Sequence, residues 1–197
     1  MAGAPSPELS HPLRTSLPLI LRSLKRRAEF QRKAGEIYGA IVTQARQRAF
    51  YADLGIPDTP TGRYEMVVIH LFLVLERLRS EGALTEPVTQ ELVDAFVADI
   101  DDSLRELGTG DIGVPRRVKR AAAGFYARAR DYRQALEASG TALEQTLARH
   151  LGDADATEPR IGALSAYVRA AAASLAGQHV EELIEGRPSF PDPKGVP

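Results

Sequence analysis

Apolar residues recur every three or four positions over most of the chain, which is the period of one helix face. The pattern is clearest in residues 87–107 and in the segment that begins at Pro115. The two apolar stripes consist of Val93, Phe96, Ile100, Leu104 and Leu107, and of Val118, Ala122, Phe125, Ala129, Tyr132 and Leu136. Because no segment alternates with the period of a strand, the pattern predicts an all-α protein.

Prolines and glycines predict where helices begin and end. Further helices are expected over 19–51, 62–80, 141–151 and 159–185, the first with a break near Gly35 or Gly39. Thr141 and Glu144 have the spacing of a capping box. These segments predict an irregular bundle of about six helices. Eight of the thirteen prolines lie in 1–18 and 188–197, so we expect one domain over 17–186 between irregular or extended tails, 1–16 and 187–197.

Composition argues against several classes of catalyst and cofactor site. The chain has 197 residues and no cysteine, which excludes disulfides, thiolate-bound zinc, iron–sulfur clusters and cysteine nucleophiles. The four histidines lack metal-ligand spacing, and no serine lies in a nucleophile motif. We therefore expect no enzyme, cofactor, bound metal or small-molecule substrate. His70 lies inside the apolar run 66–75 and is predicted to be a core histidine whose ring is satisfied by hydrogen bonds. The alternative is a functional role of His70 in binding.

A G-x-G-x-x-G pattern occurs at 108–113, between two predicted helices. A dinucleotide-binding loop would follow a strand, and here a helix precedes it. The glycines therefore indicate an interhelical turn, with Asp111 just before the next helix. The acidic helix 87–107 and the basic start of the next helix are expected to pack antiparallel. Arg116, Arg117, Lys119 and Arg120 would then meet Glu106, Asp102 or a partner protein.

The first predicted helix carries a concentrated basic surface. Residues 1–50 contain nine Lys or Arg against three acids, although the formal net charge of the chain is −1. Such a basic amphipathic helix can lie on anionic lipid or contact ribosomal RNA. The alternative is an ordinary basic helix that docks on the bundle. The candidate residues are Arg22, Lys25, Arg26, Arg27, Arg32 and Lys33.

Three ordered blocks of sequence resemble the ubiquinol–cytochrome c chaperone family. Residues 38–51 contain YGAIVTQARQ followed by AFY, residues 62–75 contain GRYEM followed by LFLVL, and residues 99–115 contain SLRE followed by GTGDIGVP. The resemblance extends over about 35–150 and is strongest to bacterial members. Arg48 stands where many relatives would have proline.

This resemblance implies an all-α assembly chaperone for the cytochrome bc1 complex rather than an enzyme. Its implied partners are newly made cytochrome b or a similar apolar membrane client, a small partner subunit, and the ribosome or an anionic membrane surface. It implies a cytoplasmic protein, or one peripheral at the inner face of the membrane. The turn 108–115 would then be a further partner surface, through Gly108, Gly110, Asp111, Gly113 and Pro115.

Two questions stay open at the level of sequence. Aromatic residues beside apolar stripes are candidates for a client groove, although most such residues belong to a core; they are Phe72, Phe125 and Tyr126. The alternative function is an all-α nucleic-acid-binding regulator, or a ribosome-associated factor without a cytochrome client. Residues 52–64 faintly resemble a helix-turn-helix, but Pro57 and Pro60 would interrupt its recognition helix.

Overall fold

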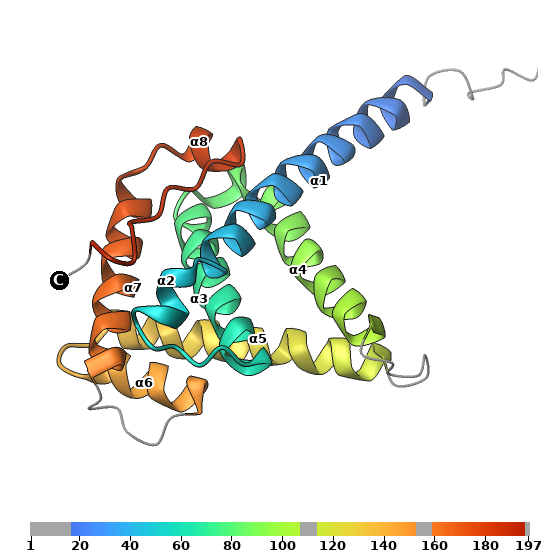
Figure 1. The fold of residues 1–197 in the computed structure, drawn as a ribbon. Coiled ribbons are helices and arrows are strands. Elements are labelled where there is room, and N and C mark those ends of the chain that lie inside the picture. Colours follow the sequence, from blue (N-terminus) through green and yellow to red (C-terminus); the bar gives the residue numbers. More distant parts are fainter. Residues whose placement is uncertain (1–16, 107–113, 153–158, 196–197) are drawn as a thin grey trace, which may run out of the picture.

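The computed structural model describes residues 17–106, 114–152 and 159–195, and in this part of the chain it is helical without strands (Figure 1). The all-α prediction is therefore confirmed. The elements are α1 (Leu17–Ala45), α2 (Arg48–Ala52), α3 (Pro60–Arg79), the 3₁₀ turn η2 (Gly82–Leu84), α4 (Glu86–Glu106), α5 (Val114–Glu137), α6 (Ala142–Leu151), α7 (Pro159–Gly177) and α8 (Val180–Ile184).

Helix α3 is the centre of the bundle. It contacts α1, α4, α5, α6, α7 and α8, and every residue from Val68 to Leu75 is buried. A helix that neighbours surround on all sides needs apolar residues around its whole circumference, which explains the run 66–75. Among the described residues, no helix combines the length and the apolar character needed to cross a bilayer.

The start of α3 is fixed by capping and by close packing. The Thr59 hydroxyl accepts a hydrogen bond from the Gly62 N–H at 3.1 Å, and Pro60 occupies the first helical position. Both features are typical of helix N-termini. Gly62 also lies directly against the Pro57 carbonyl oxygen, where an added Cβ would overlap that atom. Only glycine leaves room for this approach of the two backbone segments.

Three details of the predicted helices need correction. The first predicted helix does break, but at residues 46–47 between α1 and α2, while Gly35 and Gly39 lie inside α1. The last predicted helix is divided into α7 and α8. At the start of α6, Thr141 makes no capping hydrogen bond. The capping-box partner Glu144 instead accepts a hydrogen bond from Ser165 on α7 at 2.8 Å, because tertiary packing offers its carboxylate another donor.

The prediction for His70 is confirmed, since both ring nitrogens have partners in the core. Nδ1 lies 2.6 Å from the Met66 carbonyl oxygen and Nε2 lies 2.8 Å from the Tyr167 hydroxyl. A carbonyl can only accept, so Nδ1 carries the proton and Nε2 accepts from Tyr167. Burial lowers the pKa of His70 to about 4. The Phe190 ring covers the imidazole at 5.1 Å between centroids, so the segment 187–195 lies against the core.

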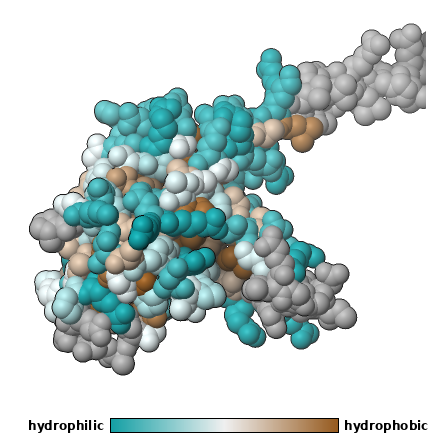
Figure 2. Space-filling model, viewed as in Figure 1, coloured by the Kyte–Doolittle hydropathy of each residue, from teal (hydrophilic) through white to brown (hydrophobic). Residues whose placement is uncertain are grey.

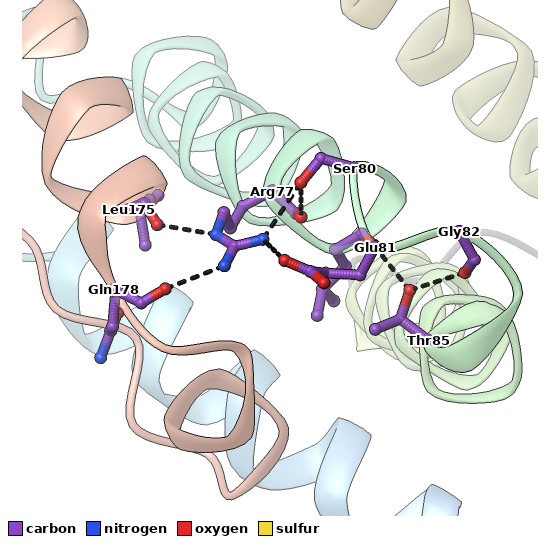
Figure 3. Close-up of polar contacts among 8 residues, drawn as sticks. Arg77, Ser80, Glu81, Gly82, Thr85, Leu175 and Gln178 are labelled. Carbon is purple, nitrogen blue, oxygen red and sulfur yellow. Dashed lines mark hydrogen bonds and ion pairs between the residues drawn. The ribbon is translucent and has the colours of Figure 1, made fainter.

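Arg77 joins the end of α3 to the end of α7 (Figure 3). Its guanidinium donates to the carbonyl oxygens of Leu175 at 3.0 Å and Gln178 at 2.9 Å. Just after the end of α3 it donates to Ser80 at 3.0 Å and to Glu81 at 2.5 Å. The last carbonyls of a helix lack intrahelical donors and carry partial negative charge. One arginine therefore satisfies the end of α7 and fixes it against α3.

Candidate functional site

A groove of about 680 Å³ lies between α1, α3, α4 and α5. In the view of Figure 1 α4 runs from its crossing with α1 to the start of α5, and Figure 2 shows hydrophobic surface in a hollow that hydrophilic side chains border. The described lining residues are Tyr38, Arg46, Pro60, Arg63, Tyr64, Val67, Phe96, Asp99, Ile100, Ser103, Arg120, Ala121, Gly124 and Arg128. A concave site of this size that combines apolar surface with a few charged groups is typical of a binding site.

The floor of the groove is apolar and largely aromatic. Tyr64 and Val67, three residues apart on α3, lie on the same face of that helix. The Phe96 ring from α4 lies 6.3 Å from that of Tyr64 and 6.4 Å from that of Tyr38. Behind it, Phe125 packs against Phe96 at 5.2 Å. The packed rings give the floor a fixed shape, in which Tyr38 and Phe96 are buried and Tyr64 is half-buried.

One wall of the groove is anchored by a buried carboxylate. The Glu65 side chain is 0% exposed and accepts hydrogen bonds from Arg128 Nε at 2.8 Å and from the Tyr132 hydroxyl at 2.5 Å. Burial and the neighbouring Glu65 carboxylate raise the pKa of Tyr132. Arg128 is thereby held over the face of the Tyr64 ring, 5.6 Å from its centroid, in a cation–π contact. Glu65 therefore positions an arginine at the groove from inside the core.

The rim of the groove contains further arginines and one acid. Arg63 pairs with Asp58 at 2.5 Å. The Tyr38 hydroxyl donates to Asp99 at 2.9 Å, and burial together with Asp99 raises the pKa of Tyr38. Arg46 and Arg120 also line the groove, but the guanidinium group of neither forms a hydrogen bond or ion pair with another residue that the structure describes.

The predicted basic surface occupies the part of α1 that projects beyond the bundle in Figure 1. Five of its six members, Arg22, Lys25, Arg26, Arg27 and Arg32, are exposed, and Lys33 is half-buried. Two of their ion pairs lie within α1, namely Arg32–Glu36 at 2.6 Å and Lys33–Glu29 at 3.3 Å. A third ion pair joins Arg27 to Glu91 on α4 at 3.3 Å. Leu24, which lies among these charges, is 58% exposed. The surface is therefore both basic and partly apolar.

The second predicted partner surface is described only in part. Gly108, Gly110, Asp111 and Gly113 lie outside the described residues, and Pro115 and Arg117 lie in the first turn of α5. Arg116, Lys119 and Arg120 are exposed. No ion pair joins these three to Asp102 or to another residue within the described ranges. The side chains of Arg117 and Glu106, which belong to the same expectation, lie outside the described part of the chain. Of this set, Arg120 lies at the groove.

The three aromatic candidates differ in accessibility. Phe72 and Phe125 are each 1% exposed, so they offer no surface to a client in this conformation. Tyr126 is 47% exposed on α5, with its ring 5.4 Å from that of Phe125. Phe96 is buried to the same extent, at 1% exposed, and lies beneath the floor, whereas Tyr64 is half-buried and faces the groove. Neither residue was predicted as part of a site from the sequence. Their only signal was position, since Tyr64 adjoins the apolar run of α3 and Phe96 belongs to the stripe of α4.

Two comparisons with known proteins agree with this architecture. The family model for the ubiquinol–cytochrome c chaperone matches residues 52–190, from the end of α2 to the segment that covers His70. The crystal structure of the Cbp3 homolog from Brucella abortus is similar with a TM-score of 0.79 and 39% sequence identity, covering 90% of this chain and 99% of that chain. No curated protein matches. The chain therefore belongs to the ubiquinol–cytochrome c chaperone family.

Proposed function

We propose that this protein shields newly made cytochrome b during assembly of the cytochrome bc1 complex. Membership of the family supports a chaperone role in that assembly, a protein client and a non-enzymatic activity. The observation that carries the proposal is the apolar groove of about 680 Å³ between α1, α3, α4 and α5. A helix of a membrane protein exposes apolar surface until it reaches lipid, and a groove with a preformed apolar floor covers one face of such a helix.

The proposal is tested in a deletion strain by reduced-minus-oxidised haem spectra of its membranes. We expect loss of the haem bands of the bc1 complex and their return on complementation. Direct contact is tested with a photoreactive amino acid at Ala121, which lines the groove, and at Leu84, which is exposed on η2 outside it. Cytochrome b should crosslink from position 121 and not from position 84. Normal haem bands in the deletion strain would contradict the assembly role.

We further propose that the basic surface of α1 contacts the ribosome or an anionic membrane. Its exposed cations surround Leu24, and basic side chains beside apolar ones favour binding to anionic surfaces. The double substitution Arg26→Glu/Arg27→Glu should weaken co-sedimentation with ribosomes or anionic vesicles. Arg130→Glu/Arg187→Glu is the matched control, because both arginines are exposed elsewhere on the protein. Equal co-sedimentation of both variants and the wild type would contradict the proposed contact of the basic surface with ribosomes or anionic membranes.

The start of α5 is proposed as the contact for a small partner subunit. Arg116 and Lys119 are exposed there and make no ion pair with any described residue, so they are available to an acidic partner. Co-purification from the native host tests this, with Arg116→Glu/Lys119→Glu beside the wild type. We expect a small co-purifying protein to be lost from the variant, and its retention would contradict the assignment.

A further inference from the structure

We propose that the groove selects apolar helical segments that carry a carboxylate beside their apolar face, and that Arg46 and Arg120 recognise this carboxylate. The inference rests on the proposed function only in taking the groove as the client site. It adds a chemical property of the client, because apolar surface alone would not distinguish one membrane segment from another. Its evidence is the distribution of paired and unpaired charges around the groove.

Most of the charges that face the groove are already committed within the fold. Arg63 pairs with Asp58, and Arg128 is held by Glu65. The Asp99 carboxylate accepts a hydrogen bond from the Tyr38 hydroxyl. Two guanidinium groups are left, those of Arg46 and Arg120, and neither has a hydrogen-bonding partner among the described residues. The charges of the Arg63–Asp58 and Arg128–Glu65 pairs cancel. The charges that remain at the groove are those of Arg46, Arg120 and Asp99, so the groove has a net positive charge.

The two arginines come from different sides of the groove. Arg46 follows the last residue of α1, and Arg120 lies in the second turn of α5. A guanidinium presents a planar set of donors that matches a carboxylate. At the edge of an apolar floor the surrounding water is partly displaced when a ligand binds, and a charge-assisted hydrogen bond becomes stronger there than in bulk water. Charge complementarity of this kind contributes specificity more than affinity.

The chemistry fits a membrane-protein client better than a nucleic acid. Carboxylates are rare in membrane-spanning helices and are functional where they occur. A chaperone that covers both the apolar face and the acidic group would protect such a helix before insertion. Nucleic acid, in contrast, is bound by a row of cations along its phosphates. This groove has an apolar floor of Val67, Ile100 and the aromatic rings, and Asp99 on its rim.

The test uses the full chain and a synthetic helical peptide with blocked ends. One face of the peptide carries leucines at helical spacing, and one position beside that face is Glu, Gln or Lys. Binding is measured by fluorescence anisotropy at physiological salt. We expect the Glu peptide to bind about tenfold more tightly than the Gln peptide, a difference of the size of one charge-assisted hydrogen bond. The Lys peptide should bind more weakly than either, because like charges repel.

Variants then assign the preference to residues. Arg46→Gln and Arg120→Gln should each reduce the preference for Glu over Gln to about threefold or less, with little change in the affinity for the Gln peptide. Arg130→Gln is the matched control, since Arg130 is exposed on the same α5 that carries Arg120 but does not line the groove, and it should keep the preference. Circular dichroism spectra and melting temperatures show whether each variant is folded. All three side chains are exposed, so folding should be retained.

Three results of the peptide assay would overturn the inference. They are equal binding of the Glu and Gln peptides, a preference that survives in the Arg46→Gln/Arg120→Gln double variant, and no binding of any peptide. A fluorescent RNA hairpin that binds more tightly than the Glu peptide, and loses binding in the double variant, would assign the arginines to phosphate and also overturn it. The assembly role itself is tested separately by the haem spectra. Equal peptide binding with missing haem bands would therefore reject carboxylate selection alone.

Discussion

Replacement of the buried Glu65 by glutamine should destabilise the protein severely while changing its shape very little. The carboxylate is fully buried and accepts hydrogen bonds from Arg128 and Tyr132. Glutamine has nearly the same volume but no charge, and it can offer only one acceptor oxygen. The substitution therefore leaves one of the two donors without an acceptor and leaves the guanidinium without its counter-charge.

The expected loss follows from the burial of each partner. Removing one member of a buried ion pair costs about 3–5 kcal/mol of folding free energy. The Arg128 side chain is 26% exposed, so water can solvate part of the released charge, and we expect about 2–4 kcal/mol. For a chain of this length a loss of about 3 kcal/mol lowers the melting temperature by about 6–12 °C. Tyr132→Phe removes only one hydrogen bond to the carboxylate and should cost about 1.5–3 kcal/mol.

Urea unfolding followed by circular dichroism at neutral pH measures these losses. Glu137→Gln is the control, because Glu137 is exposed near the end of the same α5 that carries Arg128, and it should unfold at the wild-type midpoint. A Glu65→Gln variant within about 0.5 kcal/mol of the wild type would refute the reasoning, since the buried charge would then contribute nothing to the fold. Loss of peptide binding in a folded Glu65→Gln protein would show in addition that Glu65 positions Arg128 at the groove.

Three further predictions concern the core. The pKa of His70 is about 4 in the folded protein and about 6.5 in an unfolded chain. Between these two pH values only the unfolded chain binds a proton at His70. The free energy of unfolding therefore falls by about 1.4 kcal/mol per pH unit as the pH drops from about 6.5 to about 4. Urea unfolding should show this slope reduced in His70→Gln, and an unchanged slope would contradict it. Arg77→Lys cannot bridge two carbonyls and should speed hydrogen exchange in 178–195, whereas unchanged exchange would show that the bridge is dispensable. In Gly62→Ala the added Cβ overlaps the Pro57 carbonyl oxygen, so the variant should lose about 1–3 kcal/mol of folding free energy. Gly162→Ala is the control, because the added Cβ meets open space on α7. Equal melting temperatures of the two variants would refute this prediction.

The helices could be predicted from the sequence because their apolar period is local information. The stripe of α5 is an example, since Phe125, Ala129 and Tyr132 are all buried. The break after α1 could not, because 46–47 contains neither glycine nor proline and Gln47 makes no side-chain cap. Gln44, one turn earlier, hydrogen-bonds to Tyr167 across the core. Contacts between residues distant in sequence therefore help to set this boundary.

The groove could not be predicted because no single helix contains it. Its residues come from four elements that are separated along the chain, and each contributes only a few side chains. Charge clustering led to the basic surface of α1 and to Arg120 on α5, and of these only Arg120 lies at the groove. Charge counts along the chain also gave no sign that Glu65 is buried, since a single acid beside an apolar run is equally consistent with an exposed position.

The groove and the basic surface of α1 differ in how strongly the fold determines their shape. Helix α3 presents Tyr64 and Val67 to the groove, while its residues from Val68 to Leu75 are packed in the core. An apolar ligand face that binds there meets packed floor side chains whose positions are already fixed, so little ordering of the floor accompanies binding. The cations on the projecting part of α1 are long, exposed side chains with few fixed contacts, and they suit a surface of variable structure such as anionic lipid. We therefore expect substitutions in the groove to change which client binds, and substitutions on α1 to change where the protein binds it.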